Sequence, residues 1–399
     1  MDTIRVLHVI GSSKFGGASA IILGLAEVAK REGWEVDILA TDPVFQEKVR
    51  GAGIGLVALN GINREIRPLA DLRGLWRLWR FLRAKRYTIV HTHTSKGGFL
   101  GRLAAKLAGV PVVVHTAHGF AIHEASPVME KIAYVALERL ASSWCDEIVC
   151  VSEFHRDWGS QLGLARDRKL VAIPNGIQRQ RCLPALPPAQ VRESLGIAPE
   201  TFAILCPSRL APQKGIEDLL HAVLRFKGLL EGRFHVYLAG EGPAQEEYKA
   251  LSAQLGLSDL VTFLGFRDDI PNLLAAADLV VLPSIREGLS ISLLEAMAAS
   301  KPIVATSIGS NREVQSALLV EPGNRDELAS AIVRMYQDRN LAAQLGQNAG
   351  LRFRQHYTEE TMLQDYRRLY LRLLSSKRAL PAAAPPAREW QSTEERKAS

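Results

Sequence analysis

The sequence predicts an α/β protein made of two doubly wound parallel sheets. Three observations support this fold class. The 399 residues are enough for two domains, each with its own core. Short runs rich in Val, Ile and Leu alternate with helical patterns, which is typical of right-handed βαβ units. The alternation stops once, at a proline-containing stretch, and then begins again.

The first half of the chain carries the elements of one sheet. Several of its apolar runs are continuous, which suits strands covered on both faces. Helical spacing lies between them, for example over Ala18–Glu32 and Phe99–Ala108. We therefore place an N-terminal Rossmann-like domain over residues 1–178. Its predicted strands are Ile4–Ile10, Val36–Ala40, Leu56–Leu59, Thr88–His91, Val112–Thr116, Glu147–Val151 and Leu170–Ile173.

The second half repeats the pattern after a linker. Residues 179–200 contain prolines and no strong periodicity, so we interpret them as that linker. A C-terminal Rossmann-like domain covers residues 201–357, and residues 358–375 form a closing helix. Residues 376–399 are Ala- and Pro-rich and then polar, a composition typical of a disordered tail. The predicted strands are Phe202–Cys206, His235–Ala239, Val261–Leu264, Leu279–Leu282, Ile303–Thr306 and Leu318–Val320.

The excess positive charge lies in the N-terminal half. Residues 1–180 hold 24 basic and 17 acidic residues, so the net charge of +7 belongs entirely to them. Such a surface suits nucleic acid, an anionic membrane or phosphorylated substrates. The chain lacks the modules and interleaved aromatics of nucleic-acid-binding proteins, so we expect no nucleic-acid partner.

Eleven basic and two acidic residues fall within Arg64–Lys106. Inside it, Asp71–Tyr87 has helical spacing, and arginines flank an apolar face. The helix could pack on the sheet and leave a solvated basic edge. Alternatively, this edge could rest on anionic lipid. The face consists of Leu72, Leu75, Trp76, Leu78, Trp79 and Leu82.

Four cysteines without CxxC spacing are typical of a reduced, cytoplasmic protein. No apolar run approaches the roughly 18 residues of a membrane-spanning helix. The N-terminus lacks the basic region of a signal peptide. We therefore expect a cytoplasmic protein.

Ligands of doubly wound domains bind beyond the carboxyl ends of the strands, and two such domains in tandem would form a cleft there. After the first strand, Gly16 and Gly17 let the backbone approach a ligand, before a helix whose amides attract anions. A tight strand-to-helix turn is the alternative. The loop is neither GxGxxG nor a Walker A motif, so nicotinamide binding is weakly supported.

Arg209 and Lys214 share the loop after the first strand of the second half. Arginine offers multidentate hydrogen bonds and lysine a mobile charge, so the two suit a diphosphate. A solvated basic loop is the alternative.

A third loop carries Glu287. A helix begins after it, at Gly288, Leu289 and Ser290, and the first amides of this helix can face a phosphate. Glu295 lies among Leu, Ala and Met residues, where a carboxylate is costly unless it is paired or bonded to a ligand. The two hydroxyls of a ribose could donate hydrogen bonds to the Glu295 carboxylate. An ordinary exposed helix residue is the alternative.

Five of the ten histidines lie between His91 and His123. His118 is our preferred candidate for bonding a ligand hydroxyl or assisting charge development, and His93 is the second. The pair His91 and His93 can suggest zinc, but no regular set of further ligands follows. We expect no metal and no cofactor.

Together these motifs resemble the family-4 retaining glycosyltransferases of the GT-B fold, from the first strand to about Ser375. AGEGP at Ala239–Pro243 and the stretch Phe263–Ser284 add to the resemblance. The histidine-rich segment is most similar to the branch that assembles bacterial capsule, exopolysaccharide and O-antigen. Ser300 differs from the glycine of the family pattern, and Glu313–Gly323 is shorter than in the family.

The resemblance implies a hexosyltransferase-type enzyme that uses a nucleotide-sugar donor, UDP-linked by family habit. The acceptor would be a saccharide or an undecaprenyl-diphosphate-linked saccharide, in capsule or lipopolysaccharide biosynthesis. The enzyme would contact the inner face of the cell membrane peripherally. No metal is implied.

The resemblance also implies residue roles. Glu295 would hold the ribose, and Arg209 and Lys214 the diphosphate. Glu287 and His118 would touch the donor sugar. The two glycines of the first loop would close over the donor.

Two alternatives remain open at this point. Nucleotide-sugar epimerases share the two-domain architecture and need no acceptor. A degenerate, non-catalytic subunit would bind the sugar nucleotide without turnover.

Overall fold

The computed structural model describes residues 3–11, 17–59, 67–122, 126–230 and 233–378. The chain forms two compact units. The N-terminal unit comprises Met1–Ile173 with Leu363–Ser399, and the C-terminal unit comprises Pro174–Met362. The chain therefore re-enters the N-terminal unit within its last helix, α15 (Glu359–Arg378). Gly16 and most of the predicted tail lie outside the described residues.

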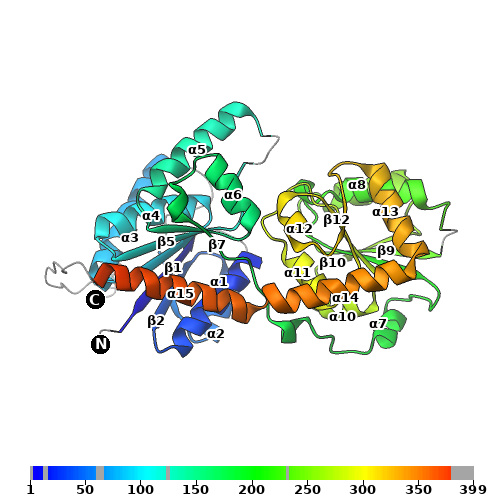
Figure 1. The fold of residues 1–399 in the computed structure, drawn as a ribbon, viewed down its shortest axis with the longest axis horizontal. Helices are drawn as coiled ribbons and strands as arrows, with labels where there is room; N and C mark the ends of the chain where they lie inside the picture. Colours follow the sequence, from blue (N-terminus) through cyan, green and yellow to red (C-terminus); the bar gives the residue numbers. More distant parts are fainter. Residues whose placement is uncertain (1–2, 12–16, 60–66, 123–125, 231–232, 379–399) are drawn as a thin grey trace, which may run out of the picture. The chain divides into compact units, whose positions relative to one another are not determined.

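The N-terminal unit is built on a seven-stranded parallel sheet, which confirms the first predicted sheet (Figure 1). Its strand order is β3-β2-β1-β4-β5-β6-β7, so the order reverses between β1 and β4. Ligands of doubly wound sheets bind at such a reversal. The strands are β1 (Arg5–Gly11), β2 (Glu35–Ala40), β3 (Gly55–Val57), β4 (Ile89–His93), β5 (Val112–Ala117), β6 (Glu147–Cys150) and β7 (Leu170–Ala172).

Helices cover both faces of this sheet. On one face, α3 packs against α4, which contacts β1, β4 and β5 over a core of aliphatic and aromatic side chains. The other face carries buried histidines beneath Tyr366 and Tyr370 of α15. The helices are α1 (Gly17–Arg31), α2 (Pro43–Gly51), α3 (Pro68–Lys85), α4 (Ser95–Ala108), α5 (Val128–Ser142), α6 (Glu153–Gln161) and the 3-10 helix η1 (Asp167–Lys169).

The C-terminal unit contains a six-stranded parallel sheet, as predicted. The strand order is β10-β9-β8-β11-β12-β13, and its reversal lies between β8 and β11. These two strands precede the loops that carry most of the candidate residues. The strands are β8 (Phe202–Pro207), β9 (Phe234–Ala239), β10 (Val261–Gly265), β11 (Leu279–Leu282), β12 (Ile303–Thr306) and β13 (Leu318–Val320).

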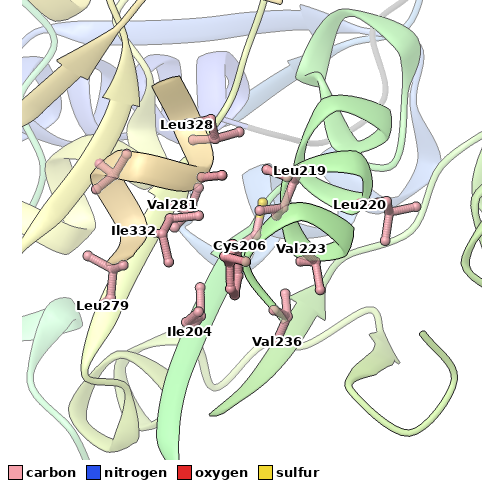
Figure 2. Packing of buried hydrophobic residues seen from close by; sticks show 14 of the residues in the cluster. Ile204, Cys206, Leu219, Leu220, Val223, Val236, Leu279, Val281, Leu328 and Ile332 are labelled. Carbon is pink, nitrogen blue, oxygen red and sulfur yellow. The ribbon is translucent and has the colours of Figure 1, made fainter. Parts of the chain in front are cut away.

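The core of this unit joins the sheet to α8 and α13. Figure 2 shows Ile204 of β8 and Val281 of β11 in one cluster with Val223 of α8 and Ile332 of α13; all four side chains are fully buried. Burial of such side chains stabilises the unit by about 2 kcal/mol each. The helices are α7 (Pro188–Ser194), α8 (Ile216–Phe226), α9 (Gln245–Gln254), α10 (Ile270–Ala276), α11 (Ile291–Ala298), α12 (Gly309–Val314), α13 (Arg325–Gln337) and α14 (Arg339–His356), with 3-10 helices η2 (Arg179–Cys182) and η3 (Pro212–Lys214).

Residues 179–200, which we interpreted as a linker, contain η2 and α7 and pack within the C-terminal unit. Val191 of α7 is buried. Arg192 donates hydrogen bonds to the carbonyl oxygen of Ala276 (3.0 Å) and to the carboxylate of Asp278 (3.2 Å). Helix α10 therefore holds α7 against the unit.

Ser300 adopts a left-handed backbone conformation, with φ of 54°. It follows the C-terminal end of α11, where glycine is the usual residue because it has no Cβ. The structure therefore shows why the family pattern has glycine at this position, and that this chain places a serine there against the preference of the backbone.

Across the described ranges, no helix combines the length and apolar character needed to cross a bilayer.

Candidate active site

The loops after β8 and β11 meet because their strands are neighbours in the sheet. Gly215 has φ of 65°, and a Cβ at this position would collide with the carbonyl oxygen of Pro283. The amide of Ile285 donates to the carbonyl oxygen of Gln213 at 2.9 Å. Only a glycine allows this close approach, which fixes the second loop against the first.

This approach brings two predicted site residues together. The ammonium of Lys214 forms an ion pair with the carboxylate of Glu287. The hydroxyl of Ser284 donates to the same carboxylate oxygen at 2.9 Å. The side chains of Lys214 and Glu287 are 19% and 14% exposed. Without a ligand, Glu287 therefore balances the charge of Lys214.

Arg209 lies on the same loop as Lys214, and its side chain is exposed. The loop after β9 crosses directly behind it. A Cβ on Gly240 would collide with the carbonyl oxygen of Ser208, and a Cβ on Gly242 with that of Leu210. These contacts explain the two glycines of the AGEGP motif, because bulkier residues would push the Arg209 loop away from its strand.

Gly288, Leu289 and Ser290 lead into α11, as predicted. Ser290 is the N-cap residue of the helix and is buried. The side-chain amide of Asn175 donates to the carbonyl oxygen of Leu289 at 3.2 Å, which holds the loop. The first amides of α11 are thus placed for an anion, with the favourable end of the helix dipole behind them.

Glu295 lies one helical turn further along α11, between the buried residues Leu294 and Ala296. Burial raises the pKa of its carboxyl to about 7. Burial and, to a smaller extent, the Glu295 carboxylate together raise the pKa of the Cys182 thiol to about 12. The interpretation of Glu295 as an ordinary exposed helix residue is wrong, because the side chain is half-buried.

In the N-terminal unit, His118 directly follows β5 and is half-buried. Its Nε2 lies 3.1 Å from Nδ1 of His93, the last residue of β4. Burial lowers the pKa of His118 to about 4, so the ring is neutral at neutral pH. Gly17 is the first residue of α1. The candidate residues are thus divided between the two units.

Three histidines could in principle hold a metal ion. Ring nitrogens of His8, His91 and His93 lie within 4.8 Å of one another. Both nitrogens of His91 are already hydrogen bonded, Nδ1 with the hydroxyl of Tyr370 at 2.5 Å and Nε2 with that of Thr116 at 2.7 Å. A shared ion would have to displace these partners. We therefore interpret the group as hydrogen-bonded, neutral histidines.

Sequence reasoning missed two contributors to the site, Ser284 and His8. Ser284 orients Glu287, but a serine after a strand carries no distinctive signal. His8 contacts His93 at 3.1 Å. A signal for His8 did exist, because it is a polar residue in the middle of the otherwise apolar run VLHVI.

Two family models match the chain in succession. The model described as "Glycosyl transferase 4-like domain" matches residues 16–176, and "Glycosyl transferases group 1" matches residues 189–352. EpsD of Bacillus subtilis, a protein named as a glycosyltransferase, is 31% identical over 357 residues, which cover 84% of this chain and 90% of EpsD. The chain belongs to the family-4 glycosyltransferases. It is therefore an enzyme, a hexosyltransferase-type glycosyltransferase, as the motifs implied.

Other similarities support the same assignment. A relative from Escherichia coli is named UDP-Gal:alpha-D-GlcNAc-diphosphoundecaprenol alpha-1,3-galactosyltransferase. It is 29% identical over 348 residues, with 85% of this glycosyltransferase and 89% of the relative covered. The crystal structure of Anabaena HepE in complex with UDP-glucose superposes with a TM-score of 0.80, at 24% identity, over 92% of this chain and all of HepE. The likeness to HepE confirms the GT-B fold.

Proposed function

We propose that this glycosyltransferase moves a hexosyl unit from a UDP-sugar to a saccharide carried on undecaprenyl diphosphate, with retention of the anomeric configuration. The product would enter cell-surface polysaccharide such as capsule or lipopolysaccharide. The name of the Escherichia coli relative supports this acceptor class, as does that of a Campylobacter jejuni relative, N,N'-diacetylbacillosaminyl-diphospho-undecaprenol alpha-1,3-N-acetylgalactosaminyltransferase, which is 24% identical over 354 residues.

The observation that carries the proposal is the ion pair of Lys214 and Glu287 beside the N-terminus of α11. A departing nucleoside diphosphate gains negative charge, and a cation and helix amides held in place stabilise that charge without reorganisation. When the diphosphate binds, it can compete with Glu287 for Lys214. The released carboxylate of Glu287 is then free to accept hydrogen bonds from sugar hydroxyls.

Glu295 supplies the selectivity for a nucleoside in this proposal. Its carboxylate can accept hydrogen bonds from the two ribose hydroxyls, and these bonds would offset the cost of its burial. Arg209 is exposed on the neighbouring loop and adds a second cation for the diphosphate. With Lys214 and Arg209 as counter-charges, we propose that the reaction needs no metal ion, so turnover should survive excess EDTA.

A donor and acceptor screen tests this function. Purified enzyme is incubated with UDP-galactose, UDP-N-acetylgalactosamine or UDP-glucose, with and without undecaprenyl-diphosphate-linked N-acetylglucosamine. Transfer predicts UDP release that depends on the acceptor and a glycolipid heavier by one sugar. Conversion of the donor without acceptor would indicate an epimerase. Tight UDP binding without turnover on any acceptor would indicate a non-catalytic subunit.

We further propose that the N-terminal unit rests on the cytoplasmic face of the membrane through α3. Leu78 and Leu82 of this helix are buried, so part of its apolar face packs on the unit. Leu72 and Trp76 are 64% and 51% exposed, and the guanidinium of Arg80 lies 4.9 Å from the Trp76 ring. Exposed apolar residues among arginines favour an anionic membrane surface.

Vesicle sedimentation tests this second proposal. The protein should bind vesicles containing phosphatidylglycerol at low salt, and the double variant Leu72→Ser/Trp76→Ser should bind about tenfold less. Leu229→Ser is the matched control, because Leu229 is 66% exposed in the other unit. Equal binding by the double variant and the control would contradict a role for α3.

A further inference from the structure

Three histidines from neighbouring strands form a hydrogen-bonded row that ends at His118. His8 lies in β1, His93 ends β4, and His118 follows β5, and these strands are adjacent in the sheet. Nδ1 of His8 lies 3.1 Å from Nε2 of His93, and Nδ1 of His93 lies 3.1 Å from Nε2 of His118. Successive rings are stacked, with interplanar angles of 22° and 27°.

All three rings are neutral at neutral pH. Burial lowers the pKa of His8 to about 3 and that of His118 to about 4, and it lowers the pKa of His93 well below its usual value. A neutral imidazole has one N–H donor and one bare acceptor nitrogen. Each contact in the row therefore needs one donor and one acceptor, so the whole row must point in one direction.

The inner end of the row decides that direction. His8 is fully buried, and its Nε2 has no hydrogen-bond partner within the described part of the chain. A buried N–H without an acceptor is rarer in proteins than an acceptor atom without a donor. Surrounding C–H groups can also face a bare nitrogen, whereas they cannot accept from an N–H. The proton of His8 therefore belongs on Nδ1.

The tautomers of His93 and His118 follow from that of His8. His8 donates through Nδ1 to Nε2 of His93, and His93 in turn donates through its own Nδ1 to Nε2 of His118. His118 must then carry its proton on Nδ1. The neighbouring histidines do not interrupt the row, because His91 is bonded to Tyr370 and Thr116, and His115 lies 3.0 Å from the hydroxyl of Thr92.

We propose that His93 and His8 are positioning residues that fix His118 as a hydrogen-bond donor through Nδ1, directed at an oxygen of the bound donor substrate. This inference rests on the proposed function only for the identity of that oxygen, a sugar hydroxyl or a phosphate oxygen. The direction of the row is a property of the free protein. A histidine free to change tautomer would present an acceptor part of the time and would lose the bond to such an oxygen.

The first test reads the tautomers directly. Full-length protein labelled with 15N-histidine is studied by NMR without ligand at about pH 7.5, where N–H and bare ring nitrogens have well-separated 15N shifts. The signals of His118 are assigned by their loss in His118→Gln. We expect His118 to be protonated on Nδ1 and bare on Nε2. Protonation on Nε2, or a zinc ion bound in stoichiometric amount between His8 and His93, would overturn the proposal.

The second test separates positioning from simple structural support. Gln at position 93 can accept from His8 and donate to His118, whereas Leu can do neither. We expect His93→Leu to lower kcat about 10-fold or more, and His118 to populate both tautomers in this variant. In His93→Gln, kcat and the Nδ1 tautomer of His118 should both return toward those of the wild type. His115→Leu is the matched control, because it removes an equally buried histidine outside the row.

These experiments distinguish the proposed transferase function from the proposed role of the histidine row. A correct His118 tautomer in a protein without transferase activity would contradict the proposed function alone. An active enzyme in which His93→Leu leaves the His118 tautomer unchanged would contradict the positioning role of the row and leave the proposed function standing. If His93→Leu does not fold, the wild-type spectrum and that of His93→Gln still decide the direction of the row.

Discussion

Replacing Glu295 by Gln should abolish a pH dependence of donor binding that the wild-type enzyme shows near neutrality. Burial raises the pKa of this carboxyl to about 7 in the free protein. The group is therefore about 10% ionised at pH 6 and about 90% ionised at pH 8. If only the carboxylate accepts the ribose hydroxyls, affinity should rise as the pH rises, because the binding-competent form becomes more populated.

The expected size of the effect follows from those fractions. Their ratio gives about tenfold weaker binding at pH 6 than at pH 8, which corresponds to about 1.4 kcal/mol. Glu295→Gln has no titrating group at this position and should bind with the same affinity at both pH values. Its affinity should also lie below that of the wild type at pH 8, because a neutral amide is the weaker acceptor.

Isothermal titration calorimetry with UDP-galactose measures these affinities. A sugar-linked donor is needed because a terminal phosphate, as in UDP, itself titrates near pH 6. Glu193→Gln is the matched control, since Glu193 is an exposed carboxylate on a helix of the same unit. A wild-type affinity that differs by less than twofold between pH 6 and pH 8 would refute the role of Glu295. A tenfold difference that persists in Glu295→Gln would assign the titration to another group.

Three further predictions concern the catalytic pair, acid stability and one backbone position. Lys214→Ala should lower acceptor-dependent UDP release by about 100-fold, because it removes the cation that meets the leaving diphosphate; activity within threefold of the wild type would exclude this role. Urea unfolding at pH 7.5 and pH 5 should show a lower free energy of unfolding at pH 5, because His8 and His118 each contribute a loss of about 2 kcal/mol and the other buried histidines add to it, whereas the raised pKa of Glu295 offsets about 2 kcal/mol. The sign for the histidines follows because burial holds the folded pKa values of His8 and His118 at about 3 and 4, below the ordinary 6.5, so the unfolded chain binds more protons as the pH falls below 6.5; a higher free energy of unfolding at pH 5 than at pH 7.5 would contradict the burial of these rings. Ser300→Gly should raise the free energy of unfolding by about 1 kcal/mol, because φ of 54° suits glycine, and a lower melting temperature would contradict this.

Local pattern was sufficient to predict both sheets, because central strands such as β5 and β8 are short apolar runs buried on both faces. Pattern could not predict which strands become neighbours. The ion pair of Lys214 and Glu287 joins residues 73 positions apart and depends on β8 and β11 being adjacent at the reversal of strand order. The sequence therefore predicted each residue as a ligand contact and not as a partner of the other.

The path of the last helix was likewise beyond local pattern. A closing helix was predicted at residues 358–375, but this prediction did not say on which sheet the helix packs. In the structure, Tyr366 and Tyr370 of α15 bond Thr116 (3.1 Å) and His91 (2.5 Å) of the N-terminal sheet. Such bonds between residues more than 200 positions apart leave no periodic trace in the sequence.

The most direct test of the central claim is the anomeric structure of the reaction product. The enzyme is incubated with UDP-galactose and undecaprenyl-diphosphate-linked N-acetylglucosamine, and the glycolipid is examined by mass spectrometry and by NMR of the new glycosidic bond. We predict a product extended by one hexose in α-linkage, formed with one UDP released per sugar transferred and abolished in Lys214→Ala. A β-linked product, or epimerised donor with the acceptor unchanged, would contradict the account.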